Sequence, residues 1–356
     1  MVKLRYKKII IFNDSFKDFH KLDPFTLKSI KQIEFWINLD KSKIEIIKSI
    51  LHQIEWLKIP WQSNLEFYGS FLRFCPNLKF LFMWIKHRDK KEIDECKWLL
   101  QHYPKLEHFV FDDGDAGGPE HGWTFSELRI FFEMNPNIRR FSTTFHLLYE
   151  NRNIILNSKI QFDQLDIQGR VQRPIVQDVC VLLNKLHEKN VHKHLRVYAL
   201  FATTQSLQSS LHALNALFLV QTRHITLPPM PKLKILGFNH SSVITLPNNL
   251  MDIERIYMEK ATFNEVLQFI RYAPRVTHIK IYSLNDGTYF NNKVLDLEAL
   301  NEDRKVLQGA RKITIYVDEE IFLATKWTYQ TTKIQNIEIK RSQSTEWESL
   351  CLMSSG

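Results

Sequence analysis

A short run of histidines comes close to a spacing that can bind zinc. His187 and His192 lie on either side of Glu188, and His194 follows shortly after. Two histidines four residues apart on a helix present their rings on one face, where both can bind one metal ion. Here the separation is five residues, which turns the second ring away from the first. We therefore interpret this run as the solvated end of a helix and predict no metal site.

A loop rich in aspartate and glycine offers oxygen ligands of the kind that bind calcium. It reads Asp112-Asp113-Gly114-Asp115-Ala116-Gly117-Gly118. Calcium loops of the EF-hand type place oxygen ligands at alternate positions and close with a glutamate, and this segment does neither. We interpret it as a loop that follows a strand, at a rim of the fold where loops can still contact a partner.

The common nucleophile and phosphate-binding motifs are absent from the sequence. It contains no GxSxG, no GxxxxGK[ST], no GxGxxG and no CxxC pair. Each of these motifs positions a nucleophile, a phosphate or a metal by its backbone geometry. Without them, no nucleophile with its base and oxyanion donors can be assembled, so the sequence predicts a protein that is not an enzyme and uses no cofactor.

The charge balance is basic, with 48 Lys or Arg against 39 Asp or Glu, a net charge of +9. Positive charge favours anionic partners such as nucleic acid or a membrane surface. Cations alternate with acids along the helical segments, however, as between Lys90 and Lys97, which is typical of a solvated helix face. No apolar run approaches the roughly 20 residues of a membrane helix. We therefore predict no membrane association.

The cysteines bear on the compartment in which the chain works. Cys75, Cys96, Cys180 and Cys351 are too scattered for a disulfide framework or a zinc site. The apolar run that ends at Phe12 is too short for a signal peptide. We expect reduced thiols and a monomer in the cytoplasm or nucleus.

One phrase of nine residues recurs and predicts the architecture. It reads: any residue, proline, any residue, apolar, two others, apolar, one other, apolar. Clear copies begin at Cys75, Tyr103, Asn135, Met230 and Ala273. Many steps between neighbouring copies are close to the roughly 20–29 residues of a leucine-rich repeat, and others are somewhat longer.

Copies without the proline fit the same pattern. Their apolar sites are Ile30, Ile33, Phe35; Phe162, Leu165, Ile167; Ile253, Ile256, Met258; Ala310, Ile313, Ile315; and Ile334, Ile337, Ile339. Residues 35–78 are assigned to a longer first unit, and residues 167–233 must hold at least one degenerate copy, near Leu195. We predict one irregular leucine-rich-repeat solenoid over residues 1–341 and a C-terminal tail over 342–356.

The phrase suits a strand entered from a turn. Its second and third apolar residues lie two positions apart and so share one face, and proline ends the preceding helix. Amphipathic helices are predicted at 43–51, 90–102, 125–134, 175–189, 262–272 and 294–307, with capping boxes at Thr124–Glu127 and Thr262–Glu265. The sequence predicts an α/β solenoid, curved, with parallel strands on the concave face and helices on the convex face. An ordinary doubly wound α/β domain, the alternative, would not repeat one phrase.

Residues that flank the buried sites of each strand point to the concave face. The predicted protein-binding residues are Trp36, Phe80, Phe82, Trp84, His108, Arg140, Arg255, Tyr257, His278, Lys280, Tyr282, Lys312 and Tyr316. Trp, Tyr and Arg dominate the energetics of protein interfaces. For Phe80, Phe82 and Trp84, packing beneath an N-terminal cap is an equal alternative.

The Pro-x-Leu-x-x-Leu-x-Leu phrases resemble the irregular repeats of F-box and leucine-rich-repeat proteins. The segments 309–317 and 324–327 are similar to the C-terminal units of divergent insect members, and the resemblance covers nearly the whole chain. It implies repeats that select the substrate of a cullin-RING ubiquitin ligase, while a separate F-box docks on a Skp-type adaptor. Residues 1–30 lack the Leu-Pro signature of an F-box, and Lys7–Phe12 is predicted to be a strand. The adaptor is therefore expected as a partner only if an F-box lies outside this chain. In that case, packing beneath the linker of the F-box is a further equal alternative for the aromatic residues within 80–84.

These observations predict a protein-binding module that holds a protein substrate on its concave face. The resemblance makes it the substrate-recognition part of an F-box-type ubiquitin ligase adaptor. The alternative is a nucleic-acid-binding solenoid, which needs cations concentrated beside stackable rings. The predicted face mixes acids and amides with its cations, which favours protein. A relic of the fold without a partner stays open.

Overall fold

A computed structural model describes most of the chain. The described residues are 8–12, 19–37, 39–59, 66–84, 97–112, 127–168, 177–200, 214–219, 225–226, 231–238, 244–245, 252–284, 294–329 and 334–342. The chain divides into two compact units. Unit 1 comprises Met1–Ile167 and Lys185–Lys193, and unit 2 comprises Gln168–Asn184 and His194–Gly356.

Unit 1 is built on a row of strands in which each strand pairs with the next one along the chain. The strands are β1 (Lys8–Ile11), β2 (Gln32–Phe35), β3 (Trp56–Ile59), β4 (Phe80–Trp84), β5 (His108–Asp112), β6 (Arg140–Thr144) and β7 (Phe162–Gln168). β1 to β6 pair in parallel, and their register aligns Lys8, Gln32, Trp56, Phe80, His108 and Arg140 in one line across the strands.

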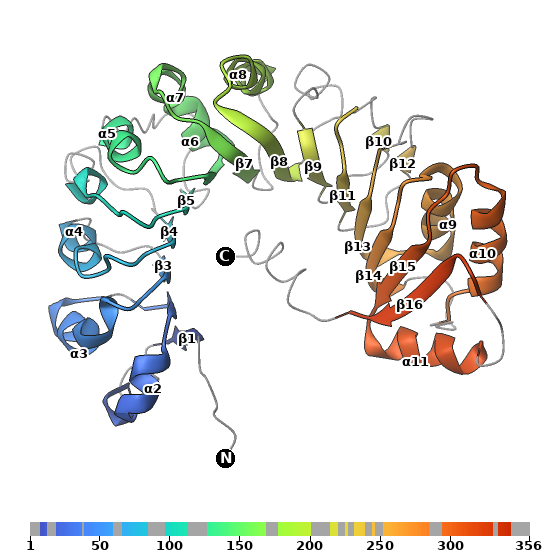
Figure 1. Cartoon of the computed structure of the whole chain (residues 1–356), viewed down its shortest axis with the longest axis horizontal. Helices are drawn as coiled ribbons and strands as arrows, with labels where there is room; N and C mark the ends of the chain where they lie inside the picture. Colours follow the sequence, from blue (N-terminus) through green and yellow to red (C-terminus); the bar gives the residue numbers. More distant parts are fainter. Residues whose placement is uncertain are drawn as a thin grey trace. The chain divides into compact units, whose positions relative to one another are not determined.

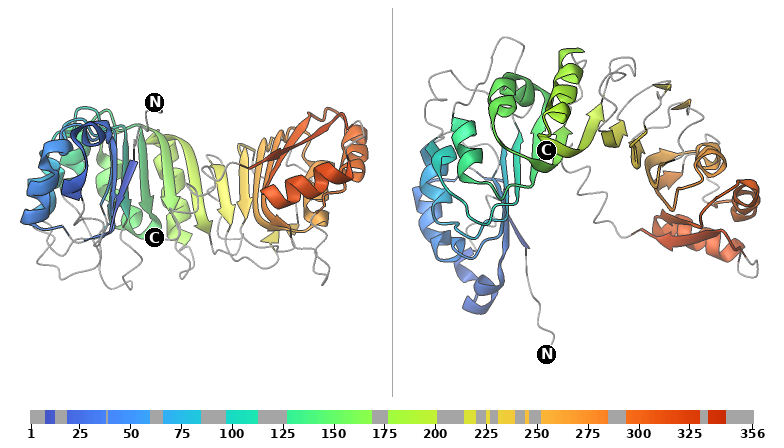
Figure 2. Two further views of the ribbon diagram at one scale, coloured as in Figure 1. Left: turned by 90° about the horizontal axis from the view of Figure 1, so that it is seen from below. Right: turned by 45° about the horizontal axis from the view of Figure 1, so that its top comes forward.

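Helices lie on one face of this row (Figures 1 and 2). They are α2 (Pro24–Ser29), α3 (Lys41–Leu51), α4 (Glu66–Leu72), α5 (Glu127–Met134), α6 (Phe145–Glu150) and α7 (Arg152–Asn157), with single 3-10 turns at Phe19–Lys21 and Lys97–Leu100. The core between the layers is rich in phenylalanine. Phe109 of β5 lies 4.7 Å from Phe131 of α5, and Phe132 lies 5.1 Å from Phe141, measured between ring centroids.

The residues that come just before β2, β3, β4, β5 and β6 are also aligned across the strands, at the turn. Backbone hydrogen bonds run from Glu55 N to Lys31 O, Lys79 N to Glu55 O, Glu107 N to Lys79 O and Arg139 N to Glu107 O. We call these five residues the charge row, because their side chains alternate in sign. Lys79 Nζ lies 2.8 Å from Glu55 Oε2, and that hydrogen bond lowers the pKa of Glu55.

Unit 2 repeats the same plan. Its strands are β8 (His192–Leu200, whose first residues belong to unit 1), β9 (Leu214–Leu219), β11 (Ile235–Phe238), β13 (Arg255–Ala261), β14 (His278–Leu284), β15 (Ile313–Val317) and β16 (Ile337–Arg341), paired in parallel in that order. Its helices are α9 (Phe263–Tyr272), α10 (Leu297–Val306) and α11 (Glu319–Thr328), and α8 (Gln177–Glu188) is shared between the units. Two short strands, β10 (Ile225–Thr226) and β12 (Ile244–Thr245), form a separate parallel pair.

The repeated phrase predicts the buried positions correctly. Its second and third apolar sites, such as Leu81 with Met83 and Ile279 with Ile281, are fully buried. Thr262 and Glu265 form the predicted capping box at α9, while Thr124 lies outside the described residues. Parallel strands alternating with helices confirm the α/β prediction and are compatible with a solenoid.

Three described strands in the wide gaps, β3, β9 and β10, were not predicted. The assignment of residues 35–78 to one long unit is wrong, because β3 lies there with Ile54, Leu57 and Ile59 buried. The expected copy near Leu195 is β8, and a further one, β9, follows it. Helices α2, α4, α6, α7 and α11 were also missed. Of the helix expected at 90–102, the described part holds only the turn at Lys97–Leu100.

Candidate protein-binding surface

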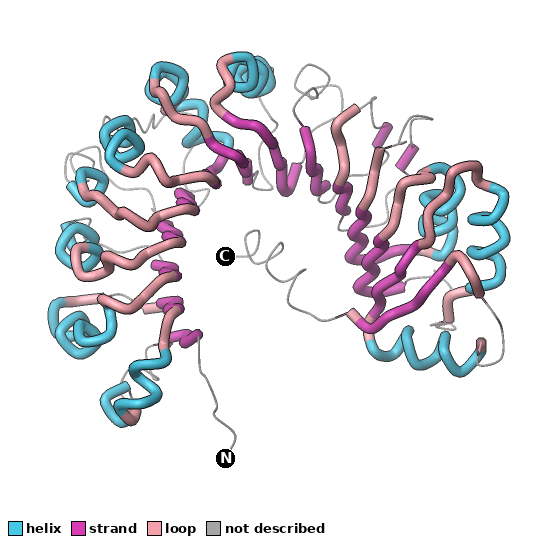
Figure 3. Tube along the Cα trace, viewed as in Figure 1, coloured by secondary structure: helices cyan, strands magenta, loops and turns pink. Residues whose placement is uncertain are grey.

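The face of unit 1 opposite the helices is the candidate surface. Figure 3 shows strands lining this side and described helices on the other. We call it the inner face. Two lines of aligned residues run across its strands. The first line contains Lys8, Gln32, Trp56, Phe80, His108 and Arg140, and the second contains Ile10, Glu34, Lys58, Phe82, Val110 and Ser142.

Glu34 is the centre of a charged cluster on the first strands. It is buried, and its carboxylate forms ion pairs with Lys8 Nζ and with Lys58 Nζ, each at 3.0 Å. Trp36 Nε1 donates to Glu34 Oε1 at 3.1 Å. Burial raises the pKa of Glu34, but hydrogen bonds from Lys8 and Lys58 outweigh burial and lower the pKa overall. The carboxylate therefore stays ionised and holds both lysines.

Lys58 is held by rings as well as by charge. Its Nζ lies 5.0 Å from the centroid of the Trp36 ring and 5.1 Å from that of Phe82. A cation within about 6 Å of an aromatic ring is attracted by the negative face of the ring. The ammonium is thus surrounded by two rings and a carboxylate, which limits its use as a free cation.

Three rings lie side by side along the first line. Trp56 and Phe80 are stacked with centroids 4.7 Å apart, and the ring of Phe80 meets His108 edge-on, also at 4.7 Å. Neighbouring parallel strands are about 4.8 Å apart, so the strand pairing itself sets this spacing. Trp56, Phe80 and His108 form what we call the ring row.

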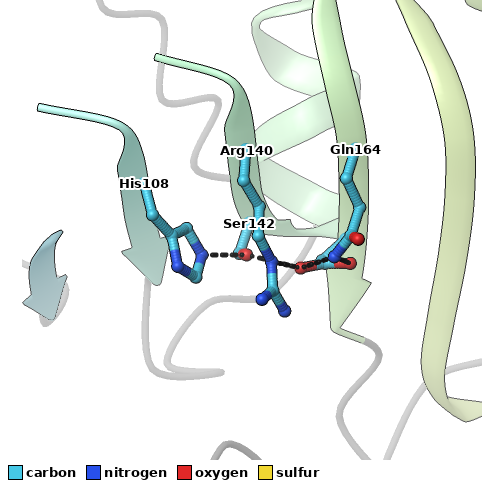
Figure 4. Close-up of polar contacts among 5 residues, drawn as sticks. His108, Arg140, Ser142 and Gln164 are labelled. Carbon is cyan, nitrogen blue, oxygen red and sulfur yellow. Dashed lines mark hydrogen bonds and ion pairs between the residues drawn. The ribbon is translucent and has the colours of Figure 1, made fainter. Parts of the chain in front are cut away.

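A polar network follows the ring row (Figure 4). Asp166 of β7 is fully buried and accepts hydrogen bonds from Arg140 Nε and from Ser142 Oγ, the latter at 3.0 Å. Gln164 Nε2 donates to the other carboxylate oxygen of Asp166, Oδ1, at 2.7 Å. Buried charges require such pairing, and here one guanidinium and two neutral donors supply it.

His108, Ser142 and Asp166 are three residue types that also occur in hydrolases, but their order here is different. Ser142 gives its single hydroxyl hydrogen to Asp166, so its oxygen accepts from His108 Nε2 at 2.9 Å. In a nucleophilic triad the histidine accepts the serine proton instead. Burial, followed by the charge of Arg140, holds the pKa of His108 well below its usual range. The histidine is therefore a neutral donor, and the network is suited to positioning Arg140.

The corresponding face of unit 2 carries a second aromatic cluster. Tyr198 and Phe218 are stacked at 4.8 Å, and Phe218 lies 5.9 Å from Tyr257. Gly237, in the strand between the last two, makes room for the Phe218 ring, because a Cβ there would lie 2.3 Å from Phe218 Cδ1. These rings are buried together.

The last strands of unit 2 present more accessible side chains. His278 and Tyr316 are stacked at 5.9 Å, and Tyr282 is 59% exposed. Lys312 Nζ and Lys340 Nζ both contact Glu338, at 3.5 and 3.1 Å. Lys312 and Lys340 are therefore paired with an acid, as Lys8 and Lys58 are in unit 1.

The predicted surface residues divide into accessible and buried ones. Trp36 at 41%, Tyr282, Arg255, His278 and Lys312 are exposed. Phe80, Trp84, His108, Arg140 and Tyr316 are half-buried. The expectation of exposure is wrong for Phe82, Tyr257 and Lys280, which are buried. Alternation does direct these three away from the helices, but Lys58 of the adjacent strand lies over Phe82, and Phe218 packs against Tyr257 from two strands away.

Trp56 and Lys58 were missed because β3 was not predicted. The signal was present: Ile54, Leu57 and Ile59 have the spacing of the three apolar sites. Ser142 was also missed. Its place in the network depends on residues 24 and 34 positions away, a separation that no local motif encodes.

The two motifs considered for metals have different outcomes. The interpretation of the histidine run as a solvated helix end is wrong for His192, which is buried at the start of β8. Its ring is not turned away from that of His187 but stacks on it at 5.6 Å. Among the described residues, no group of three or more His, Cys, Asp or Glu could hold a metal ion. Asp112 ends β5, while residues 113–118 lie outside the described part of the chain.

Comparisons with known proteins do not assign the chain to a family. No family model matches the sequence, and no curated protein matches it. In the part of the chain that the structure describes, no helix has the length and apolar character needed to cross a membrane.

Proposed function

We propose that this chain is a leucine-rich-repeat module that binds a protein partner on its inner face. One observation carries the proposal. The inner face of unit 1 presents the ring row, the exposed Trp36 and the guanidinium of Arg140 on rigid strands. Aromatic side chains and arginine supply most of the binding energy of protein interfaces.

The pairing of the lysines argues against the alternative, a nucleic-acid-binding solenoid. Nucleic acid is bound mainly by cations that are free to neutralise phosphates. Lys8 and Lys58 are both engaged by Glu34, and Lys312 and Lys340 by Glu338. These four lysines are therefore not free to neutralise phosphates, although the net charge of the chain is +9.

The finer proposal is that the module selects the substrate of an F-box-type ubiquitin ligase. It rests on the resemblance of the repeat phrase and on nothing else. An F-box outside residues 1–356 would have to supply the link to the Skp-type adaptor. We therefore expect the adaptor not to co-precipitate with this chain alone, and stoichiometric recovery of the adaptor would contradict this.

Matched variants of the two faces test the main proposal. Partners captured with the full chain are identified by mass spectrometry and then measured against each variant. On the strand side the variants are Trp36→Ala with Phe80→Ala, and separately Tyr282→Ala. The controls are Ile46→Ala with Ile130→Ala, and separately Trp327→Ala, which are exposed apolar residues on helices.

The two sets give opposite outcomes. We expect a direct partner to be lost with a strand-side variant and kept by the helix controls. If instead the helix variants lose the partner and the strand variants keep it, the binding surface is the helical face and the proposal fails.

A further inference from the structure

The polar network leaves part of one guanidinium unused. Arg140 donates from Nε to Asp166, and neither of its Nη nitrogens has a hydrogen bond or ion pair with another described residue. The side chain is 30% exposed. Figure 4 shows the two terminal nitrogens at the end of the side chain, clear of the carboxylate.

The network also fixes the direction of that guanidinium. Asp166 cannot turn away easily, because Ser142 and Gln164 hold its two oxygens at 3.0 and 2.7 Å. A planar guanidinium whose position is already set loses little entropy when it binds. Its remaining N–H groups match the two oxygens of a carboxylate, which they can bind side by side.

The charge around Arg140 favours a carboxylate over a phosphate. The other cations on the described strands of the inner face, Lys8 and Lys58, are held by Glu34. Those two lysines lie at least three strands away, roughly 14 Å at the usual strand spacing. One guanidinium suits one carboxylate, whereas a phosphate group carries up to two charges at neutral pH.

An apolar surface lies beside the guanidinium at a distance a peptide can span. In the register of β4, β5 and β6, Phe80 is two strands from Arg140, about 10 Å. Three residues of extended chain cover the same length at about 3.3 Å each. Beyond Phe80, Trp56 continues the apolar surface.

On the basis of the proposed function, we infer that the inner face of unit 1 binds an extended acidic peptide. The carboxylate of an aspartate or glutamate side chain binds the Nη nitrogens of Arg140. An aromatic or aliphatic side chain about three residues along the peptide packs on Phe80 and Trp56. The partner of this module therefore presents an acidic residue spaced from an apolar one in an exposed segment.

The test uses phage that display random 12-residue peptides, selected on the full chain. Selected peptides are synthesised with a fluorescent label, and their affinity is measured by anisotropy. For each peptide, the acidic residue is also replaced by its amide. A labelled single-stranded DNA of 20 thymidines is measured in parallel.

Four variants of the chain separate the roles of charge and geometry. Arg140→Lys keeps the positive charge but removes the planar pair of Nη nitrogens. Arg140→Gln with Asp166→Asn removes the pair without leaving a buried charge. Phe80→Ala leaves the polar network intact. Arg129→Gln is the matched control, because Arg129 Nε also bonds a carboxylate, that of Glu133 at 2.8 Å, but on helix α5. Circular dichroism confirms that each variant is folded.

We expect selected peptides to carry an acidic residue with an apolar one about three positions away. Affinity should fall at least tenfold with either Arg140 variant and with Phe80→Ala, and not with Arg129→Gln. The amide peptides should lose at least tenfold on the native chain and nothing further on the Arg140 variants.

Three results would overturn the inference. The first is that the selected peptides lack acids, or bind the Arg140 variants unchanged while still losing affinity with Phe80→Ala; this outcome leaves the proposed function standing. The second is that no inner-face variant changes the affinity of the selected peptides, which would contradict both this inference and the proposed function. The third is that the thymidine strand binds tightly through Arg140 and peptides do not, which would make the site one for nucleic acid.

Discussion

Nη2 of Arg304 donates a hydrogen bond of 2.7 Å to the carbonyl oxygen of Pro274. It is one of five such bonds from this guanidinium to backbone carbonyls, the others being those of Ile270, Ala273, Val276 and Arg311. The side chain is 1% exposed. Burial lowers the pKa of Arg304 to about 10, so it is still charged at neutral pH. It satisfies carbonyls at the end of α9 that the helix itself leaves open.

We predict that Arg304→Met destabilises the chain by about 2–5 kcal/mol, because several buried carbonyls lose a charged donor. Urea unfolding followed by circular dichroism measures the change. Arg271→Met is the control, since Arg271 is exposed and pairs with Asp303 at 3.0 Å; an exposed pair contributes at most about 1 kcal/mol. Equal losses in the two variants would mean that the buried bonds add nothing.

The repeated nine-residue phrase predicts at which positions truncation of a side chain most lowers the free energy of unfolding. Leu81→Ala and Ile279→Ala each remove a fully buried side chain and should cost about 2–5 kcal/mol. Ile46→Ala, at an exposed position on α3, should cost far less. The same urea titration tests all three, and losses under about 1 kcal/mol at both buried sites would contradict the register.

Gly237 should tolerate a side chain only if Phe218 is absent. Gly237→Ala forces the Phe218 ring to shift, because the added carbon would lie 2.3 Å from Cδ1. We expect a loss of about 1–3 kcal/mol, as for other overpacked sites. In a Phe218→Ala background the same substitution should be neutral or stabilising, because alanine loses less backbone entropy than glycine. A double-mutant cycle measures this coupling, and equal effects in both backgrounds would show that the ring does not limit the site.

Asp40 should make stability depend on pH in acid. Its side chain accepts from Lys43 N at 2.9 Å and from Ser42 Oγ at 2.6 Å, at the start of α3. The hydrogen bond from Ser42, with the backbone bond from Lys43, lowers its pKa from 3.8 to about 2. A lowered carboxyl pKa stabilises the fold above pH 4 and loses that effect as the pH falls toward 2.

Asp40→Ala should therefore cost about 1 kcal/mol at pH 7, the usual value of a helix cap. The difference from the native chain should shrink as the pH is lowered from 4 to 2. Urea midpoints of both proteins at each pH give this difference, and other carboxyls affect both alike. A difference that stays constant with pH would show that the charge of Asp40 has no part in the cap.

The sequence is enough to predict the buried lines of the fold, because one spacing of apolar residues recurs. Leu81 with Met83 and Ile279 with Ile281 follow from that spacing alone. β3 was missed although Ile54, Leu57 and Ile59 have the same regular spacing as the copies without a proline that were recognised. The network around Asp166 could not be predicted, since His108, Ser142 and Asp166 become neighbours only through the register of three strands.

Which side chains of the inner face are buried could not be predicted from the sequence either. Alternation indicates which way Phe82 points, but not that Lys58 approaches it from the next strand at 5.1 Å. The same holds for Tyr257, whose cover includes Phe218 from two strands away. How far a side chain on a sheet face is buried depends on the sizes of its neighbours on other strands, and those neighbours are far apart in the sequence.

The charge row has a consequence for how the number of repeats can change. Lys31, Glu55, Lys79, Glu107 and Arg139 alternate in sign from one strand to the next. Twenty-four residues separate Gln32 from Trp56 and again Trp56 from Phe80, so unequal crossing-over could remove one repeat and preserve the strand register. Such a deletion would bring Lys31 beside Lys79, and like charges on adjacent strands are destabilising. Loss of two repeats would instead bring Lys31 beside Glu107. Gain or loss of two repeats together would therefore keep the alternation of sign along the charge row, whereas gain or loss of one would break it.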